Sequence, residues 1–353
     1  MDDQTAFILT IQLIALTGIA GSLLLYLLCK VRTRRHTYDT EFTTLNVGTG
    51  RSVLITSCDS NFGLQLALHL TALGFRVFAG FKPADEDESD VLNCEAGRIL
   101  KAKLKHREVL MSSVASGEED GIVRGATCGS TITLALDVTR EDSLHEAVNV
   151  VRRHLPAGED GLWAVINTAG VCFKGRLELQ DSSQWDTMFK VNVVGTLRTA
   201  RAFLPLLRNK KGRLLNIGTN SDYNSPGMVA YNAARHAVAG ANCSLRTEIG
   251  PLGVHVITLQ PDFVASEKLF AKPRVVCAEG TETSLPNDRY VKHNLSVVPT
   301  YVMHIIEEAL LSVAPKSTYQ LIAPGSISNY VTAITERFTN QGYKNKDNGG
   351  SLY

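Results

Sequence analysis

Residues 53–70 read as a buried strand, a turn and the start of a helix, an arrangement that can bind the phosphates of a nucleotide. In such a site the backbone amides at the helix N-terminus face the phosphates, and glycines let the chain approach them closely. The turn Thr56–Gly63 has one glycine where three are usual. Taken alone, it is compatible both with a nucleotide site and with an α/β domain that binds no nucleotide.

Short apolar runs alternate with helical patterns from residue 51 onward. Continuously apolar strands separated by helices indicate a parallel sheet that is covered on both faces. We therefore predict an α/β domain with a doubly wound, Rossmann-like parallel sheet, and further helices near residues 96–109 and 300–315. The predicted strands are SVLIT, RVFAGF, ITLALDVT, LWAVINTAG, GRLLNIGT and VHVITLQP.

The N-terminal residues 6–29 contain no charged side chain. Because roughly 20 apolar residues suffice to cross a bilayer as a helix, we predict a transmembrane anchor within residues 1–29, followed by a linker at 30–50. The chain opens with MDDQ and has its basic cluster, KVRTRRH, after the apolar run, which places the remaining chain in the cytosol. A buried core helix is the alternative interpretation.

Composition excludes several function classes. The net charge of +1 over 353 residues, without a basic stripe, gives no reason to expect nucleic-acid binding. Seven scattered cysteines form no C-x-x-C pair, and nine histidines form no H-E-x-x-H motif. We expect no metal site, and we expect reduced, mostly buried thiols.

Further motifs follow the turn in a fixed order. They are LDVT with Asp137, NTAG at 167–170, VNVVG with Asn192, YNAAR at 231–235 and QPDFVAS at 260–266. Together they resemble the short-chain dehydrogenase/reductase family over about residues 51–266. The likeness is closest to the branch with retinol, hydroxysteroid and 3-hydroxybutyrate dehydrogenases, whose turn often reads TGCDSGFG; residues 56–63 match six of these eight positions.

This resemblance implies hydride transfer between a nicotinamide cofactor and a carbonyl or alcohol carbon. Tyr231 stands where the family has its general acid or base, and Arg235 stands where the family has a lysine. Arginine keeps the charge one helical turn away but does not deprotonate, so it cannot relay a proton. Thr219 takes the place of the family serine, with Ser221 as an alternative, and Asn192 matches an asparagine that holds a helix bend.

The cofactor-binding residues that the resemblance implies lie mainly at the carboxyl ends of predicted strands. Ser57 and Asn61 replace family glycines; serine is small, and asparagine tolerates a positive φ. Lys82 favours NADP, but related enzymes use NAD without an acid there, so both cofactors remain open. The full set is Thr56, Ser57, Ser60, Asn61, Phe62, Gly63, Lys82, Asp137, Val138, Asn167, Ala169, Gly170, Tyr231, Arg235, Pro261, Phe263 and Val264.

The sequence therefore predicts a membrane-anchored NAD(P)-dependent oxidoreductase acting on a lipophilic alcohol or ketone, such as a steroid or retinoid. We expect a catalytic domain at 51–266, a substrate lid and helical region at 267–340 and a disordered tail at 341–353. The endoplasmic reticulum is the expected location, and a mitochondrial membrane is the alternative. The substituted motifs leave open a catalytically impaired, cofactor-binding or scaffold protein. The family is commonly dimeric or tetrameric, so a homo-oligomer is compatible with the sequence.

Overall fold

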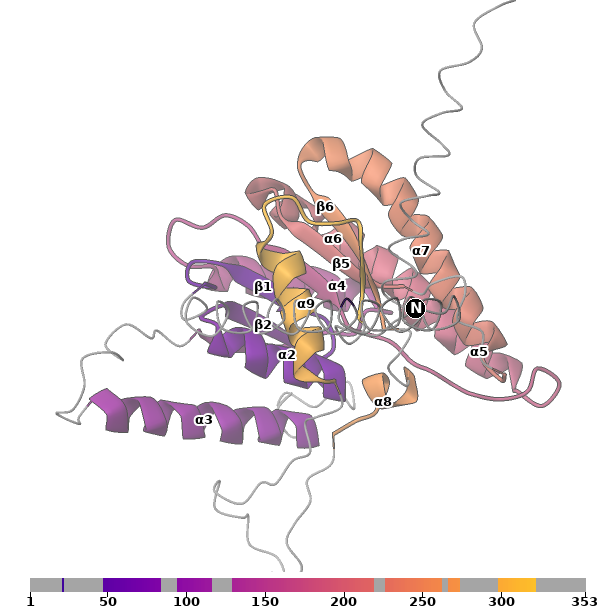
Figure 1. The fold of residues 1–353 in the computed structure, drawn as a ribbon, viewed down its shortest axis with the longest axis horizontal. Coiled ribbons are helices and arrows are strands. Elements are labelled where there is room, and N and C mark those ends of the chain that lie inside the picture. Colours follow the sequence, from indigo (N-terminus) through magenta and orange to yellow (C-terminus); the bar gives the residue numbers. More distant parts are fainter. Residues whose placement is uncertain are drawn as a thin grey trace, which may run out of the picture.

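A computed structural model of the chain describes residue 21 and residues 47–83, 94–115, 129–218, 226–261, 266–273 and 298–321. These residues form a layered α/β fold in which helices flank a central sheet (Figure 1). The predicted transmembrane segment, except residue 21, lies outside the described residues. Within the described ranges, no helix combines the length and apolar character needed to cross a bilayer.

In the described part of the chain, seven parallel strands form one sheet in the order β3-β2-β1-β4-β5-β6-β7. The chain runs outward from β1 to β3, returns to place β4 beside β1, and then runs outward to β7. The loops that follow β1 and β4 therefore diverge and create the crevice where such sheets bind ligands. The strands are β1 (Ser52–Ile55), β2 (Arg76–Phe81), β3 (Thr131–Ala135), β4 (Ala164–Asn167), β5 (Arg213–Ile217), β6 (His255–Gln260) and β7 (Thr318–Gln320).

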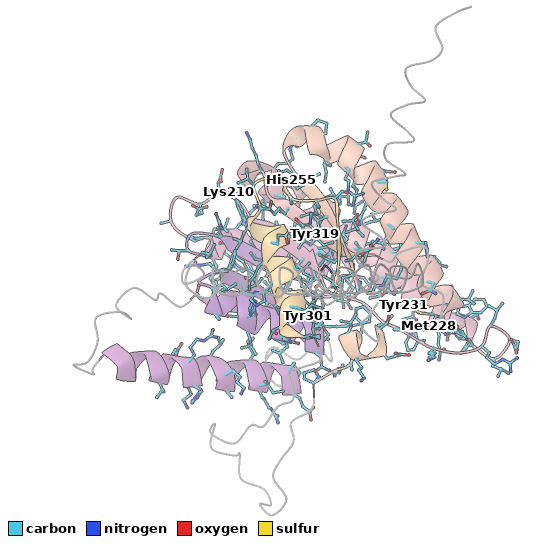
Figure 2. The ribbon with its side chains drawn as sticks, in the orientation of Figure 1. Lys210, Met228, Tyr231, His255, Tyr301 and Tyr319 are labelled. Atoms are coloured by element: carbon cyan, nitrogen blue, oxygen red, sulfur yellow. The ribbon has the colours of Figure 1, made fainter. Side chains whose placement is uncertain are left out.

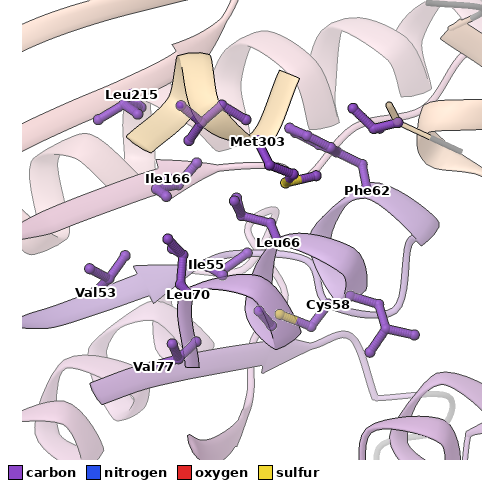
Figure 3. Close-up of a cluster of buried hydrophobic side chains, with 14 of the residues drawn as sticks. Val53, Ile55, Cys58, Phe62, Leu66, Leu70, Val77, Ile166, Leu215 and Met303 are labelled. Carbon is purple, nitrogen blue, oxygen red and sulfur yellow. The ribbon is translucent and has the colours of Figure 1, made fainter. Parts of the chain in front are cut away.

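Helices cover both faces of this sheet, as the sequence predicts. One apolar cluster joins Val53 and Ile55 to α2, α3 and α9, and Figure 3 shows part of it around Leu66, Leu70 and Met303. A second cluster joins Leu54 on the opposite face to α4, α6 and the end of α7. The helices are α2 (Asn61–Ala72), α3 (Glu95–Ala115), α4 (Glu141–His154), α5 (Ser182–Phe189), the π-helix η2 (Lys190–Gly195), α6 (Thr196–Lys210), α7 (Val229–Ile249), the 3₁₀ turn η3 (Gly250–Leu252), α8 (Ser266–Phe270) and α9 (Thr300–Leu311).

One strand was not expected from the sequence. β7 has three residues of mixed polarity at the sheet edge, so it lacks the apolar run that marks the other strands. η2 interrupts one apparent helix between α5 and α6. The prediction of mostly buried thiols is wrong for the described residues: Cys58 is buried, Cys94 and Cys172 are partly buried, and Cys243 is exposed on α7.

Candidate active site

The turn between β1 and α2 is held by its own side chains. Ser60 caps α2: its Oγ accepts a hydrogen bond from the Gly63 amide at 3.2 Å and donates one to the Ser57 carbonyl at 3.0 Å. Among the described residues other than glycine, Lys211 is the one with a positive φ, so neither Ser57 nor Asn61 needs the left-handed conformation. Asn61 therefore does not use the tolerance of asparagine for a positive φ, and its expected contact with the cofactor stays a prediction.

Gly63 is the glycine that this turn does require. A Cβ built on Gly63 would overlap the Ser57 carbonyl oxygen, because the first turn of α2 packs directly on the chain that leaves β1. The close packing explains why this glycine remains while the other two positions carry side chains.

Two threonines tie the end of β1 to the end of β4. Thr56 Oγ1 accepts hydrogen bonds from the amides of Thr168 and Ala169 at 3.1 and 3.0 Å. Thr168 Oγ1 in turn donates to the Ser57 carbonyl and accepts from the Ser57 amide, each at 3.1 Å. These bonds hold the turn between β1 and α2 against the end of β4, where the chain continues to Gly170, and these two segments form the walls of the crevice.

Tyr231 and Arg235 form the buried polar pair at the start of α7. Their relative exposures are 4% and 3%, and Arg235 Nε donates to Tyr231 Oη at 3.0 Å. Arg235 Nη1 donates to the carbonyl of Ile217 at the end of β5, at 2.7 Å. Among the described residues, Nη2 has no hydrogen-bond partner. The predicted i, i+4 pairing is confirmed, and it leaves one buried donor available.

Apolar side chains surround this pair. Met188, Met228 and Ala230 pack with Tyr231, and Figure 2 shows Met228 and Tyr231 together, at the opposite end of the molecule from Lys210 and His255. Burial, with a smaller effect of the Glu267 charge, raises the pKa of the nearby Cys172 thiol to about 11, so this cysteine stays protonated and is no nucleophile at neutral pH. The partly buried members of the cluster are Val171, Cys172, Phe173, Trp185 and Phe270.

Asn192 holds the loop that follows β4. It lies fully buried in the π-helix η2, where its Oδ1 accepts from the Val171 amide at 2.8 Å and its Nδ2 donates to the Val171 carbonyl at 2.9 Å. π-Helical turns inside α-helices are frequent at functional sites. Asn192 therefore lies at a helix irregularity, as expected, and its part in catalysis stays a prediction.

Lys82 and Asp137 meet at the ends of β2 and β3, where their charged atoms lie 3.3 Å apart. Burial acts to raise the pKa of Asp137, but hydrogen bonds from the Thr139 amide and hydroxyl and the Lys82 charge outweigh it, so this pKa lies below its ordinary value. Any 2′-phosphate that binds Lys82 must compete with the Asp137 carboxylate.

Asn167 belongs to a chain of buried side chains that runs through the sheet. Its Nδ2 donates to Asn216 Oδ1 at 2.7 Å, Asn216 Nδ2 donates to Asn242 Oδ1 at 2.6 Å, and Asn242 Nδ2 donates to Thr258 Oγ1 at 2.9 Å. The Asn167 side chain thus reaches into the protein interior and binds β5, and through β5 it links the crevice to α7.

The structure also shows the surroundings of three other predicted site residues. Val138 is buried against Gly195, Pro261 is buried after the end of β6, and Phe62, on the first turn of α2, is buried in the core. The expected hydroxyl at Thr219, its alternative Ser221 and the loop residues Asp262, Phe263 and Val264 lie outside the described residues.

Three contributing residues were not predicted from the sequence. Thr168 lies inside the NTAG motif, yet nothing in its type marks it as the residue that joins two strand ends. The buried amides of Asn216 and Asn242 were also missed, although a polar residue inside the apolar run RLLNI was an available signal.

The comparison with protein families agrees with this geometry. The family model described as short chain dehydrogenase matches residues 123–272. D-beta-hydroxybutyrate dehydrogenase, mitochondrial, from Rattus norvegicus is 28% identical over 305 residues, covering 81% of this chain and 80% of that protein. The family model and this relative support placing this chain among the short-chain dehydrogenases.

Another curated relative and one solved structure are similar to parts of the chain. Estradiol 17-beta-dehydrogenase 2 of Mus musculus is 32% identical over 215 residues, which are 60% of this chain and 47% of that protein. A gluconate 5-dehydrogenase from Burkholderia cenocepacia, solved in complex with NADP and tartrate, has a TM-score of 0.46 and 18% identity, with 60% of this chain and 71% of that chain covered. The family model and the dehydrogenase relatives support an NAD(P)-dependent alcohol dehydrogenase or ketone reductase, with NAD or NADP as its cofactor.

Proposed function

We propose that this chain oxidises or reduces a lipophilic alcohol or ketone, such as a steroid or retinoid, from a membrane-anchored position. The observation that carries the proposal is the Tyr231–Arg235 pair, which is hydrogen-bonded and surrounded by apolar side chains. A buried phenol beside a permanent cation is suited to proton transfer, and an apolar wall favours a lipophilic substrate.

In the proposed reaction, Tyr231 and Arg235 have different roles. Bound nicotinamide supplies or accepts the hydride. Tyr231 Oη gives a proton to the substrate oxygen in reduction and takes it in oxidation. Arg235 Nε–H donates a hydrogen bond to Tyr231 Oη, and it stabilises the negative charge on Oη after the proton has left. Arg235 does not deprotonate, so the proton must pass between Tyr231 and solvent by another route.

The residues present fit a dinucleotide. The N-terminus of α2, capped by Ser60, provides the positive helix end that favours phosphate groups. Arg235 Nη2 is a buried donor without a partner among the described residues, and it suits a ribose hydroxyl oxygen. Lys82 and Asp137 stand where the adenosine half would bind in this family, and they do not separate NAD from NADP.

The anchor and the substrate class support each other. An uncharged run at 6–29 followed by a basic cluster is suited to holding the domain on the cytosolic side of a membrane, and we propose the endoplasmic reticulum as the site. Lipophilic substrates concentrate in the bilayer, so an anchored enzyme meets them at high local concentration. One mammalian relative carries estradiol in its name, and another carries hydroxybutyrate, which is a polar substrate.

Turnover by the full-length chain in detergent micelles tests the proposal. We expect production of reduced nicotinamide, followed by absorbance, with a steroid alcohol or retinol, and not with 3-hydroxybutyrate. Tyr231→Phe should lower kcat by about 10²-fold or more. The matched control is Tyr301→Phe, a tyrosine on α9 away from this pair (Figure 2), which should retain kcat. Turnover of 3-hydroxybutyrate alone, or an active Tyr231→Phe protein, would overturn the proposal.

A second candidate is a family member that binds the cofactor without turning over substrate. It is favoured by the arginine at position 235 and by the contact of α8 with both walls of the crevice. Restoring the family residues in a double variant, Arg235→Lys with Thr219→Ser, separates the two functions. The active enzyme gains nothing from this change, whereas a protein that has lost only its chemistry gains turnover.

A further inference from the structure

Helix α8 lies against the candidate cofactor site. The short helix is drawn beside the N-terminus of α2 in Figure 1, and the amide of Asn61, the first residue of α2, donates a hydrogen bond to the carbonyl of Ala271 at 2.9 Å. An amide at this helix end is the type of donor that binds a phosphate. In this structure the donor is already bound by the chain's own carbonyl.

Phe270, one residue earlier, contacts the other wall of the crevice. Its ring packs so closely on Gly170 that a Cβ built there would lie 2.5 Å from the ring atom Cε1. The Arg235 guanidinium carbon lies 4.9 Å from the ring centroid, within cation–π range. The ring also meets Tyr231 edge-on, with centroids 6.5 Å apart and an interplanar angle of 62°.

The remaining residues of α8 hold it in this place. Leu269 is fully buried in the cluster that includes α2 and α9. Glu267 lies 3.9 Å from Lys174, which is in the loop after β4, and both side chains are largely exposed. The anchoring is therefore mainly apolar, and the ion pair adds little.

We propose that α8 is a built-in competitor for the cofactor, with Phe270 and the Ala271 carbonyl occupying groups that the dinucleotide needs. The inference rests on the proposed function, because it takes this crevice as the cofactor site. NAD(P) can then bind only when α8 has left both walls of the crevice. The apparent dissociation constant equals the intrinsic dissociation constant divided by the fraction of molecules in which α8 has left. Phe270 thereby sets the affinity for NAD(P) although it does not bind it.

The first test measures NADH and NADPH binding to the full-length chain by fluorescence, with wild type, Phe270→Ala and Lys268→Ala. Phe270→Ala loses the contacts with Gly170, Tyr231 and Arg235 and should bind about tenfold more tightly, in line with the loss of one desolvated cation–π contact. Lys268 is exposed on the same helix, so Lys268→Ala should bind as wild type does. Melting temperatures of the three proteins establish that each is folded.

The second test needs no variant and uses hydrogen exchange on the wild-type chain. If α8 competes with the cofactor, adding NADH or NADPH speeds exchange in the peptide covering residues 266–273. If α8 closes over the cofactor instead, exchange there slows, and the proposal is overturned. Equal or weaker binding by Phe270→Ala overturns it as well and leaves the proposed function standing. Failure of every variant to bind either nucleotide rejects both the proposed function at this site and the competition.

Discussion

Replacing Arg235 tests the central pair of the site. Arg235→Met keeps most of the side-chain length but removes the donors to Tyr231 Oη, at 3.0 Å, and to the Ile217 carbonyl, at 2.7 Å. Both acceptors are buried, so no water replaces the lost donors. Removing a preorganised donor to the atom on which charge develops typically lowers kcat by about 10²–10³-fold, or about 2.7–4 kcal/mol. We expect that loss in kcat, with KM less affected.

Arg235→Lys distinguishes charge from hydrogen-bond geometry. A lysine ammonium keeps the cation near Oη but lacks the planar fork that also holds the Ile217 carbonyl. We expect kcat within about tenfold of wild type, a change of about 1.4 kcal/mol or less in the activation free energy. The unfolding free energy should fall by about 1–3 kcal/mol in both variants, because the Ile217 carbonyl loses its partner.

The assay measures kcat and KM separately for the full-length proteins, beside urea denaturation. Arg246→Met is the matched control: Arg246 lies on the same helix and donates to Val256 and Thr258, away from the crevice. It should lose stability without losing kcat. A folded Arg235→Met protein that turns over at the wild-type rate would refute the assigned role of the pair.

Three further changes have defined outcomes. Asn242→Ala leaves Asn216 Nδ2 without its acceptor, so urea denaturation should show an unfolding free energy lower by about 1–3 kcal/mol; an unchanged midpoint would contradict the buried chain. Gly63→Ala forces the turn apart and should abolish binding of NADH and NADPH by titration, whereas retained affinity would show that the turn is not the phosphate site. Asp137→Asn tests pH dependence. Because the pKa of Asp137, which pairs with Lys82, lies below its ordinary value of 3.8, the ionised carboxylate stabilises the fold at pH values above 3.8. This contribution is lost as the pH falls below 3.8 and the carboxylate becomes protonated. The stability difference between wild type and Asp137→Asn should therefore shrink in acid, and a constant difference across that range would argue against this assignment.

Much of the fold was predictable because its signals are local. Five of the six predicted strands are runs that the sheet buries almost completely, whereas β3 is mostly half-buried. The pairing of Tyr231 with Arg235 follows from their spacing of four on a helix. β7 was missed because a three-residue edge strand is defined by its hydrogen bonds to β6 and not by an apolar pattern.

The missed parts of the site depend on contacts between distant segments. Thr168 and Ser57 are 111 residues apart, and their hydrogen bonds exist because parallel strands end at one edge. The position of Phe270 against Gly170 depends on where α8 packs after β6. The sequence after β6 has no regular hydrophobic pattern from which this packing could be predicted. The tolerance of asparagine for a positive φ is not needed at position 61, because this residue begins α2 without a positive φ.

Titration of the full-length chain with NADH and NADPH tests the central claim most directly. Trp163 and Trp185 transfer excitation energy to a bound nicotinamide, and thermal shift gives an independent readout. The account predicts binding of at least one of the two nucleotides at micromolar affinity, tightened by Phe270→Ala. No binding of either nucleotide up to millimolar concentration, by the wild type or by Phe270→Ala, would contradict it.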